Sequence, residues 1–101
     1  MRRSKDEVAA SILKSCISDA LSISQLMAVV NLPHKLLKYH LDRLLSFELI
    51  QFEIVGRRRR ISATEKGIHV LKYYRNAVAV LNGVVGLAQP SPNTIEEVAV
   101  L

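Results

Sequence analysis

The apolar residues at the start of the chain recur at helical spacing. Ser4 and Glu7 have the spacing of a capping box, in which each side chain bonds the other residue's backbone N–H. Intervals of one, three and four residues then separate the apolar positions Val8, Ala9, Ile12, Leu13, Cys16 and Ile17. This pattern predicts a helix over residues 5–18. Residues 20–23 are short and alternating, which predicts a brief strand.

A second and a third helix are predicted on either side of residues 31–33. Ser24 is the expected N-cap of a helix over residues 25–30, and Asn31 and Leu32 end it. Pro33 suits the first position of the next helix, where its missing N–H costs no hydrogen bond. The apolar stripe of that helix comprises Leu37, Leu41, Leu44 and Leu45. Its other face comprises His34, Lys35, Lys38, Tyr39, Asp42 and Arg43. A short turn between two helices, the second with a basic face, predicts a helix-turn-helix.

The repeat of apolar residues changes from the helical period of 3.6 to a period of 2 in residues 49–55, where apolar and polar side chains alternate. Gly56 supplies a turn, and residues 57–63 (RRRRISA) form the return strand of a hairpin. If Ile61 points inward, alternation directs Arg58 and Arg60 outward, and Arg57 and Arg59 flank the turn. A β-hairpin directly after a helix-turn-helix is a wing. The expected fold is therefore mainly α with a small β-hairpin (α+β), a winged helix-turn-helix with a fourth helix after the wing.

The helix after the wing has more apolar surface than a small body can cover. Thr64 is its expected N-cap, and Asn82 with Gly83 is its expected end. One stripe contains Leu71, Tyr74, Val78, Leu81 and Val85, and a second contains Val70, Tyr73, Ala77, Val80 and Val84. Two adjacent stripes indicate either a dimer interface or a cover formed by the tail.

We therefore expect two parts in the chain. Residues 1–81 would form the winged helix-turn-helix domain, with residues 64–81 as a dimerisation helix. The predicted dimer contacts are Leu71, Tyr74, Val78 and Leu81. Residues 82–101 would form an apolar tail that packs on this helix or on a partner chain.

Charge is distributed unevenly along the chain. The 101 residues contain 14 Lys and Arg against 9 Asp and Glu, a net charge of +5. Residues 1–76 contain all 14 basic residues and seven acidic ones, net +7, whereas residues 77–101 are net −2. A basic body favours a polyanionic partner. The N-terminus has no apolar segment typical of a signal peptide, and the uncharged run after Asn76 is too short and broken to span a membrane. We expect a cytoplasmic protein without a membrane anchor.

Two groups of side chains are candidate DNA contacts. On the third helix they are His34, Lys35, Lys38, Tyr39 and Arg43, because Lys and Arg reach guanine edges and phosphates from the major groove. In the hairpin they are Arg57, Arg58, Arg59 and Arg60, which would contact phosphates or the minor groove. The alternatives are a solvated helix face and an edge strand charged against aggregation. A smaller cluster, Arg2, Arg3 and Lys5, has two interpretations: an N-terminal arm that reaches phosphate, or the favoured one, a frayed and solvated terminus.

No catalytic or metal-binding pattern accompanies these residues. Cys16 lies on an apolar stripe and is expected to be a buried thiol. His34, His40 and His69 do not have the spacing of metal ligands. We expect no enzymatic activity, no metal and no cofactor.

The stretch NLPHKLLKYHLDRLLSFELI, the hairpin and TEKGIHVLKYY together resemble the archaeal winged-helix family that includes the small Sulfolobus 10a-type DNA-binding proteins. The resemblance covers roughly residues 5–81. It implies DNA binding and dimerisation through the helix after the wing, often as an antiparallel coiled coil. The chain departs from the family at Glu48, where Gly is usual, and at His40, where an aromatic residue is common. Gly83 and Gly86 would also shorten the dimer helix.

The combined hypothesis is a homodimer that binds double-stranded DNA, either as a transcriptional regulator or as a chromatin-associated protein. Its main alternative is a winged-helix module for protein–protein interaction without DNA binding. RNA binding is a weaker option, since no aromatic platform for stacking bases is visible.

Overall fold

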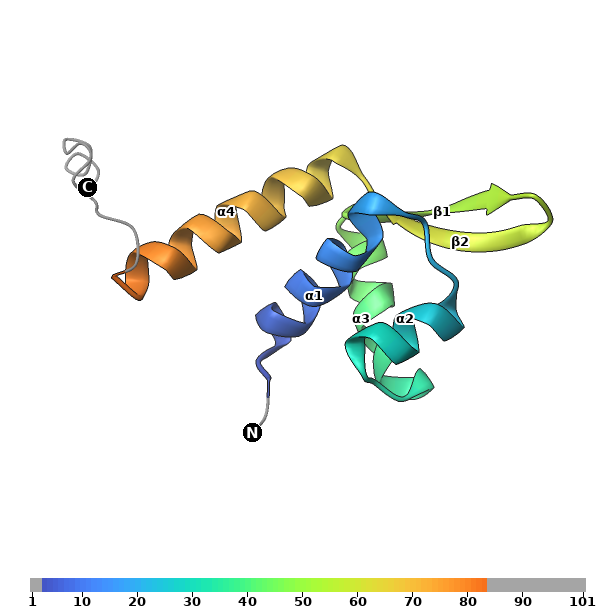
Figure 1. Ribbon diagram of the computed structural model, residues 1–101, viewed down its shortest axis with the longest axis horizontal. Coiled ribbons are helices and arrows are strands. Elements are labelled where there is room, and N and C mark those ends of the chain that lie inside the picture. Colours follow the sequence, from blue (N-terminus) through green and yellow to red (C-terminus); the bar gives the residue numbers. More distant parts are fainter. Residues whose placement is uncertain (1–2, 84–101) are drawn as a thin grey trace.

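The computed structural model describes residues 3–83. The elements are α1 (Lys5–Ser18), α2 (Ile23–Val30), α3 (His34–Ser46), β1 (Ile50–Val55), β2 (Arg58–Ala63) and α4 (Glu65–Leu81). Helices α1, α2 and α3 form a body, the hairpin extends from one side of it, and α4 extends from the opposite side (Figure 1). The predicted fold, a winged helix-turn-helix with a fourth helix after the wing, is confirmed.

Helices α1, α2 and α4 begin where side chains cap their free N–H groups. Ser4 and Glu7 form the predicted capping box of α1, with N···O distances of 2.8 and 3.1 Å. The predicted start of α2 is wrong, because Ser22 rather than Ser24 is its N-cap. Gln25 stands three residues after Ser22 and completes a second capping box there, with distances of 2.9 and 3.2 Å.

The turn between α2 and α3 depends on two backbone positions. Asn31 ends α2 in the left-handed conformation, with φ of 57°. Asn tolerates that region better than most residues. Pro33 is the N-cap of α3, and the helix begins one residue after the predicted position, at His34.

The core lies between the three helices of the body and the base of the hairpin. Its buried apolar residues are Val8, Ile12, Leu13, Cys16, Leu26, Val30, Leu37, Leu41, Leu44, Leu49, Ile50, Ile61 and Leu71. The predicted strand over residues 20–23 is reduced to one bridge, in which Leu21 and Ile61 exchange backbone hydrogen bonds of 2.7 and 2.9 Å. This bridge fixes the base of the hairpin to the segment between α1 and α2.

The hairpin is buried only at its base. Its antiparallel register pairs Phe52 with Ile61 and Ile54 with Arg59. Gly56 has a φ of 66° in the turn, the conformation that a two-residue hairpin turn favours at its first central position. The turn is where the sequence predicts it.

Two backbone carbonyls just after α3 join the end of this helix to the wing and to α4. The Thr64 N–H donates to the Leu49 carbonyl at 3.0 Å, and the Thr64 hydroxyl donates to the Glu48 carbonyl at 2.7 Å. Thr64 Oγ1 also accepts from the Gly67 N–H at 3.0 Å, as the predicted N-cap of α4. Glu48 has a φ of 61°, a left-handed conformation that Gly adopts without steric cost.

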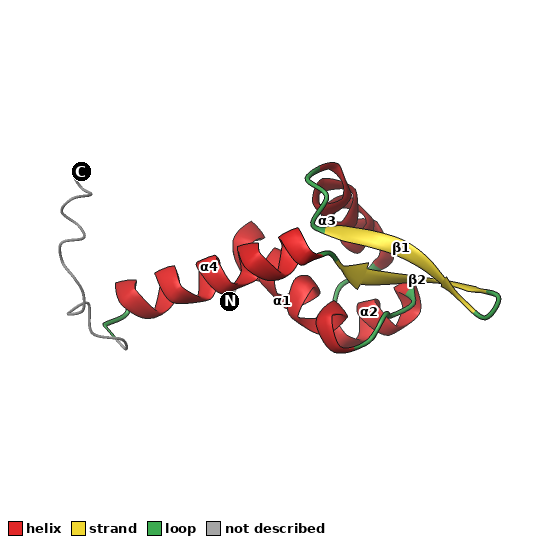
Figure 2. Cartoon of the chain, turned by 90° about the horizontal axis from the view of Figure 1, so that it is seen from above, coloured by secondary structure: helices red, strands yellow, loops and turns green. Residues whose placement is uncertain are grey.

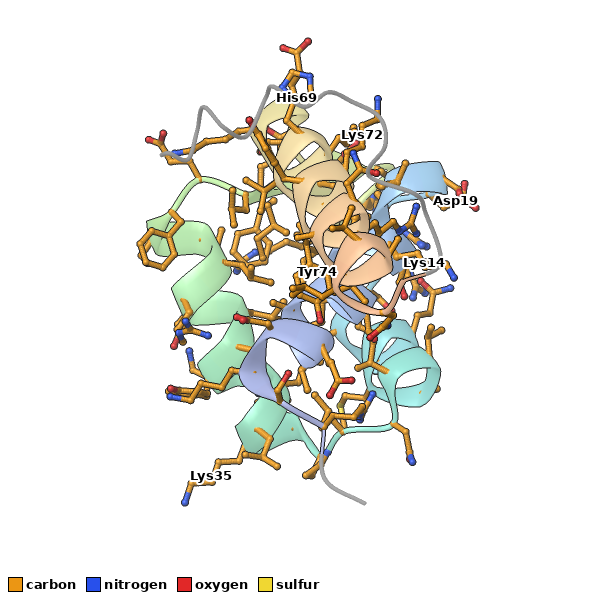
Figure 3. The ribbon with its side chains drawn as sticks, turned by 90° about the vertical axis from the view of Figure 1, so that its left-hand side faces the viewer. Lys14, Asp19, Lys35, His69, Lys72 and Tyr74 are labelled. Atoms are coloured by element: carbon orange, nitrogen blue, oxygen red, sulfur yellow. The ribbon has the colours of Figure 1, made fainter. Side chains whose placement is uncertain are left out.

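Helix α4 contacts the body through its first turns. Leu71 is 2% exposed and belongs to the chain's own core, which corrects its predicted place on a surface for a second chain. Tyr74 is half-buried between α4 and α1 (Figure 3). Farther along, Tyr73 and Leu81 are 81% and 84% exposed. The helix ends at Asn82 and Gly83 as predicted. Val84, Val85 and the rest of the predicted tail lie outside the described residues.

Gly67→Ala tests the junction at Leu49. A Cβ at position 67 would lie 2.1 Å from the Leu49 carbonyl oxygen, a backbone atom that cannot move without shifting β1. Although Ala favours a helix over Gly by about 0.5–1 kcal/mol, we expect the clash to prevail and to lower the free energy of unfolding by about 3 kcal/mol. Urea unfolding measures this difference.

Gly56→Ala is the matched control for that variant. No atom lies within 4 Å of a Cβ placed there, so only left-handed strain opposes Ala, at a cost of about 1–2 kcal/mol. A Gly67→Ala protein as stable as the unmodified chain would contradict the role assigned to this junction.

Candidate nucleic-acid interface

The exposed face of α3 brings together the residues that the sequence predicts. The helix buries Leu37, His40, Leu41 and Leu44. The predicted contacts His34, Lys35, Lys38 and Tyr39 are exposed, and Arg43 is half-buried at the edge nearer α1. Lys35 points away from the body (Figure 3). A helix with its cationic residues on the solvent side can lie in a groove of a polyanion without exposing its apolar face.

Few of these cations are neutralised inside the chain. Within residues 3–83, the one ion pair joins Lys38 Nζ to Asp42 Oδ2 at 3.4 Å, and both side chains are largely exposed. Exposed pairs of this kind contribute little to stability. The surface of α3 therefore keeps a positive potential, with one carboxylate near its centre.

Tyr39 lies among cations from two elements. Lys5 Nζ is 5.6 Å and Arg43 Cζ is 6.0 Å from the centroid of its ring. The neighbouring Lys5 ammonium lowers the pKa of the Tyr39 hydroxyl, and the charge of Arg43 lowers it further. Arg3 is held nearby, since its Nη2 donates to the Val30 carbonyl at 2.8 Å.

The basic N-terminus therefore adds to the candidate interface. The sequence favours a solvated terminus for Arg3 and Lys5 over an arm that reaches phosphate, and the structure places both residues beside α3. The sequence feature that could have indicated this placement is the capping box at Ser4. It fixes the start of α1, so that Arg3 lies just before the helix and Lys5 is its first residue. Which side of α3 they reach depends on the packing of α1 against α3.

A groove separates α3 from the wing. Its volume is about 260 Å³, with His34, Lys38, Asp42 and Arg59 at its rim and Leu41, Leu45, Phe52, Ile23 and Ile61 among its apolar lining. The Arg59 guanidinium lies 3.9 Å from the centroid of the Phe52 ring, a cation–π contact. Arg57 and Arg58 are exposed at and beside the turn. The wing extends past the body (Figure 2). Lys38 of α3 and Arg59 of the wing both line the groove.

A family model described as winged helix-turn-helix matches residues 2–81. The chain belongs to this family. Its fold is also shared by solved structures of low sequence identity, which support the fold alone. No curated protein matches the chain significantly.

Three solved structures illustrate the shared winged helix-turn-helix fold. AF1382 from Archaeoglobus fulgidus is 20% identical with a TM-score of 0.60, and the match covers 74% of this chain and 88% of that one. A mutant of S. aureus MepR, bound to an oligodeoxyribonucleotide, is 16% identical with a TM-score of 0.67 over 96% of this chain and 72% of that one. A MarR family transcriptional regulator from Silicibacter pomeroyi is 18% identical with a TM-score of 0.61 over 91% and 63%. The narrower Sulfolobus 10a-type resemblance stays a prediction.

Arg60 has a different role from the other wing arginines of this winged helix-turn-helix protein. Its Nη1 donates to Gln25 Oε1 at 3.0 Å and to the Ala20 carbonyl at 3.4 Å, and its side chain is half-buried. Gln25 Oε1 is also the acceptor in the capping box of α2. The predicted outward direction of Arg60 is therefore wrong, since its side chain joins the wing to α2.

The remaining candidates for chemistry in the winged helix-turn-helix domain are its cysteine and its potential metal ligands. Cys16 is buried, and burial raises the pKa of its thiol to about 11, so a thiolate is scarce at neutral pH. Within residues 3–83, no cluster of three or more His, Cys, Asp and Glu residues could hold a metal ion. None of the helices described there is long and apolar enough to cross a membrane.

His40 is a buried titratable group behind the exposed face of α3. It is 7% exposed and packs edge-on against Tyr39, with ring centroids 5.1 Å apart. Its Nδ1 has no hydrogen-bond partner among the described residues. Burial lowers the pKa of His40, and the charges of Arg43, Lys5 and Arg3 lower it further. Protonation of this imidazole therefore opposes folding.

We predict that acid weakens the fold through His40. Below about pH 6.5 the unfolded chain takes up a proton at this residue, whereas the folded chain does so only at lower pH. The neutral imidazole of His40 therefore makes its full contribution to the free energy of unfolding above pH 6.5. That free energy falls as the pH decreases, by at most about 1.4 kcal/mol per pH unit. Urea unfolding at pH 7.5 and 5.5 measures it.

His40→Phe should remove this part of the pH dependence, and His34→Gln, at an exposed position, should retain it. An NMR titration of the unmodified protein provides a direct check on the imidazole. An imidazole of His40 that protonates above pH 6.5 would rule the prediction out.

Proposed function

We propose that this winged helix-turn-helix protein binds double-stranded DNA as a homodimer and regulates transcription. The observation that supports the proposal is the placement of cationic side chains by α3 and by the wing along one shared groove. The major groove of B-DNA is about 12 Å wide and admits a helix. The oligodeoxyribonucleotide bound to S. aureus MepR and the regulator from Silicibacter pomeroyi support the proposal by analogy of fold.

The positions of the side chains suggest a division of roles on DNA. His34, Lys35 and Lys38 lie in the first turns of α3, the part of a recognition helix that reaches base edges. Lys5 and Arg43 lie farther from the wing around Tyr39, where they would contact phosphates of the adjacent backbone.

The wing arginines Arg57, Arg58 and Arg59 would supply further contacts to the DNA. Arg60 positions the wing for them by its bond to Gln25. The loss of Arg60 should therefore act through the orientation of the hairpin rather than through a direct contact.

The homodimer would form through α4. Tyr74 and Val78 are half-buried and Leu81 is 84% exposed on the helix that leads away from the body. An apolar stripe on an isolated helix favours burial against a second such helix. A two-fold dimer would present two copies of α3 to successive turns of the same DNA face. A cytoplasmic location remains part of this proposal.

Replacing the three exposed wing arginines tests the DNA contact. For the variant R57A/R58A/R59A we expect weaker binding to a mixed-sequence duplex and a smaller salt dependence. Each lost phosphate contact lowers the slope of log K against log salt by about 0.9, so three contacts lower it by roughly 2.7. Fluorescence anisotropy between about 50 and 200 mM salt measures both quantities.

The variant K14A/K66A/K72A removes the same charge elsewhere. Lys14 and Lys72 lie on a different side of the molecule from Lys35 (Figure 3). This variant should keep nearly the original slope. An equal loss of slope in both variants would show a general charge effect and would contradict a specific role for the wing. No binding by the unmodified protein would favour the protein–protein interaction module.

Charge introduced on the stripe of α4 tests the homodimer. We expect V78K/L81K to shift the protein from dimer to monomer, because each lysine would bury a charge in the proposed interface. The fold should persist, since neither residue belongs to the buried core. Light scattering measures the mass, and Asn76→Lys, on another face of the helix, is the control. A monomeric unmodified protein at working concentration would refute the proposed dimer.

A further inference from the structure

The tip of the wing exposes apolar side chains on both of its faces. Ile54 is 69% exposed and shares a face with Phe52 and Arg59, and Val55 is 47% exposed and shares the other face with Arg58. Neither residue belongs to the buried core. The tip therefore combines two uncovered β-branched residues with several cations.

The arginines leave these apolar residues uncovered. A long Arg side chain can shield an apolar neighbour with its methylene groups. Arg59 is paired with Ile54 across the hairpin, but its guanidinium lies 3.9 Å above the Phe52 ring, on the side toward the body. The exposed fractions of Ile54 and Val55 hold with every arginine of the wing in place.

Stability of the hairpin does not require apolar residues at these positions. Thr has the same β-branched shape and strand preference and would be compatible with solvent. Exposed apolar residues on an edge hairpin also promote aggregation. Two of them beside a turn thus point to a partner that buries them.

The chemistry of the tip fits the minor groove of DNA. Arginines are attracted to the negative potential of a narrow minor groove. Proteins that bend DNA there insert an apolar side chain between base steps and unstack them. The tip offers both features around one turn, because Arg57 follows Val55 by two residues, Arg58 pairs with Val55 across the hairpin, and Ile54 directly precedes Val55.

We propose that Ile54 and Val55 enter the minor groove as an apolar wedge and kink the DNA, an inference that rests on the proposed DNA binding. The cations Arg57, Arg58 and Arg59 hold the tip against the flanking phosphates. Wedges of this kind bend a duplex by about 20–90°. Pyrimidine–purine steps such as TA unstack most easily, so the protein favours sites that place such a step under the wing.

The variant I54T/V55T tests the wedge. Thr keeps the β-branched shape and removes apolar surface, and all the arginines remain. The probe is a duplex of roughly 30 bp with a central TA step and a fluorescence donor and acceptor at its two ends. We expect the unmodified protein to shorten the end-to-end distance on binding. The variant should bind with a similar salt slope and bring the ends clearly less close together.

Val29→Thr is the matched control, because Val29 is 62% exposed on α2 and lies outside the wing. It should bend DNA as the unmodified protein does. Ile54→Leu, which keeps an apolar side chain, should retain the bend and so separates apolar contact from the loss of a particular shape.

The outcomes separate the wedge from the proposed DNA binding. Binding of the unmodified protein without a bend, or an equal bend with I54T/V55T, overturns the wedge and leaves DNA binding intact. Absence of binding overturns both. Phosphatidylserine vesicles serve as a second probe, because basic apolar segments also bind anionic membranes. If I54T/V55T no longer bound the vesicles but bent DNA as strongly as the unmodified protein, the tip would be a membrane contact and the wedge proposal would fail.

Discussion

The carbonyl of Leu49 is the constraint on which the arrangement of this protein depends. It accepts the Thr64 N–H across the base of the wing, and Gly67 approaches it so closely that no side chain fits there. The end of α3, the start of β1, the end of β2 and the start of α4 therefore meet at one peptide group. Because close-packed atoms tolerate little displacement, this junction constrains how α3, the wing and α4 are oriented relative to one another.

This orientation determines which charges act together. The wing leaves the body beside α3, and Arg60 ties it to the first turn of α2 through Gln25. Arg59 and the first turns of α3 consequently border the same groove. On the other side of α3, α1 brings Lys5 to Tyr39. The basic surface is thus assembled from the N-terminus, the recognition helix and the wing, with a single exposed ion pair among residues 3–83.

Much of the fold can be predicted because its signals are local. The capping box at Ser4, the stripe of leucines in α3, the alternation before Gly56 and the cap at Thr64 each involve residues within one or two turns of each other. The errors are also local. Ser24 competes with Ser22 as a cap, and Gln25 decides between them. The strand expected at residues 20–23 shortens to one bridge because only Leu21 meets the wing.

By itself, then, the sequence determined the order of the elements, the exposed basic face of α3 and the position of the wing turn, since hydrophobic period, capping and turn chemistry act over a few residues. Only the tertiary structure decided that Leu71 belongs to the core, that Arg60 anchors the wing and that Lys5 lies beside Tyr39. Each of these contacts joins segments distant in the chain. The sequence shows that such residues are basic or apolar, but which residues they contact depends on how the helices pack.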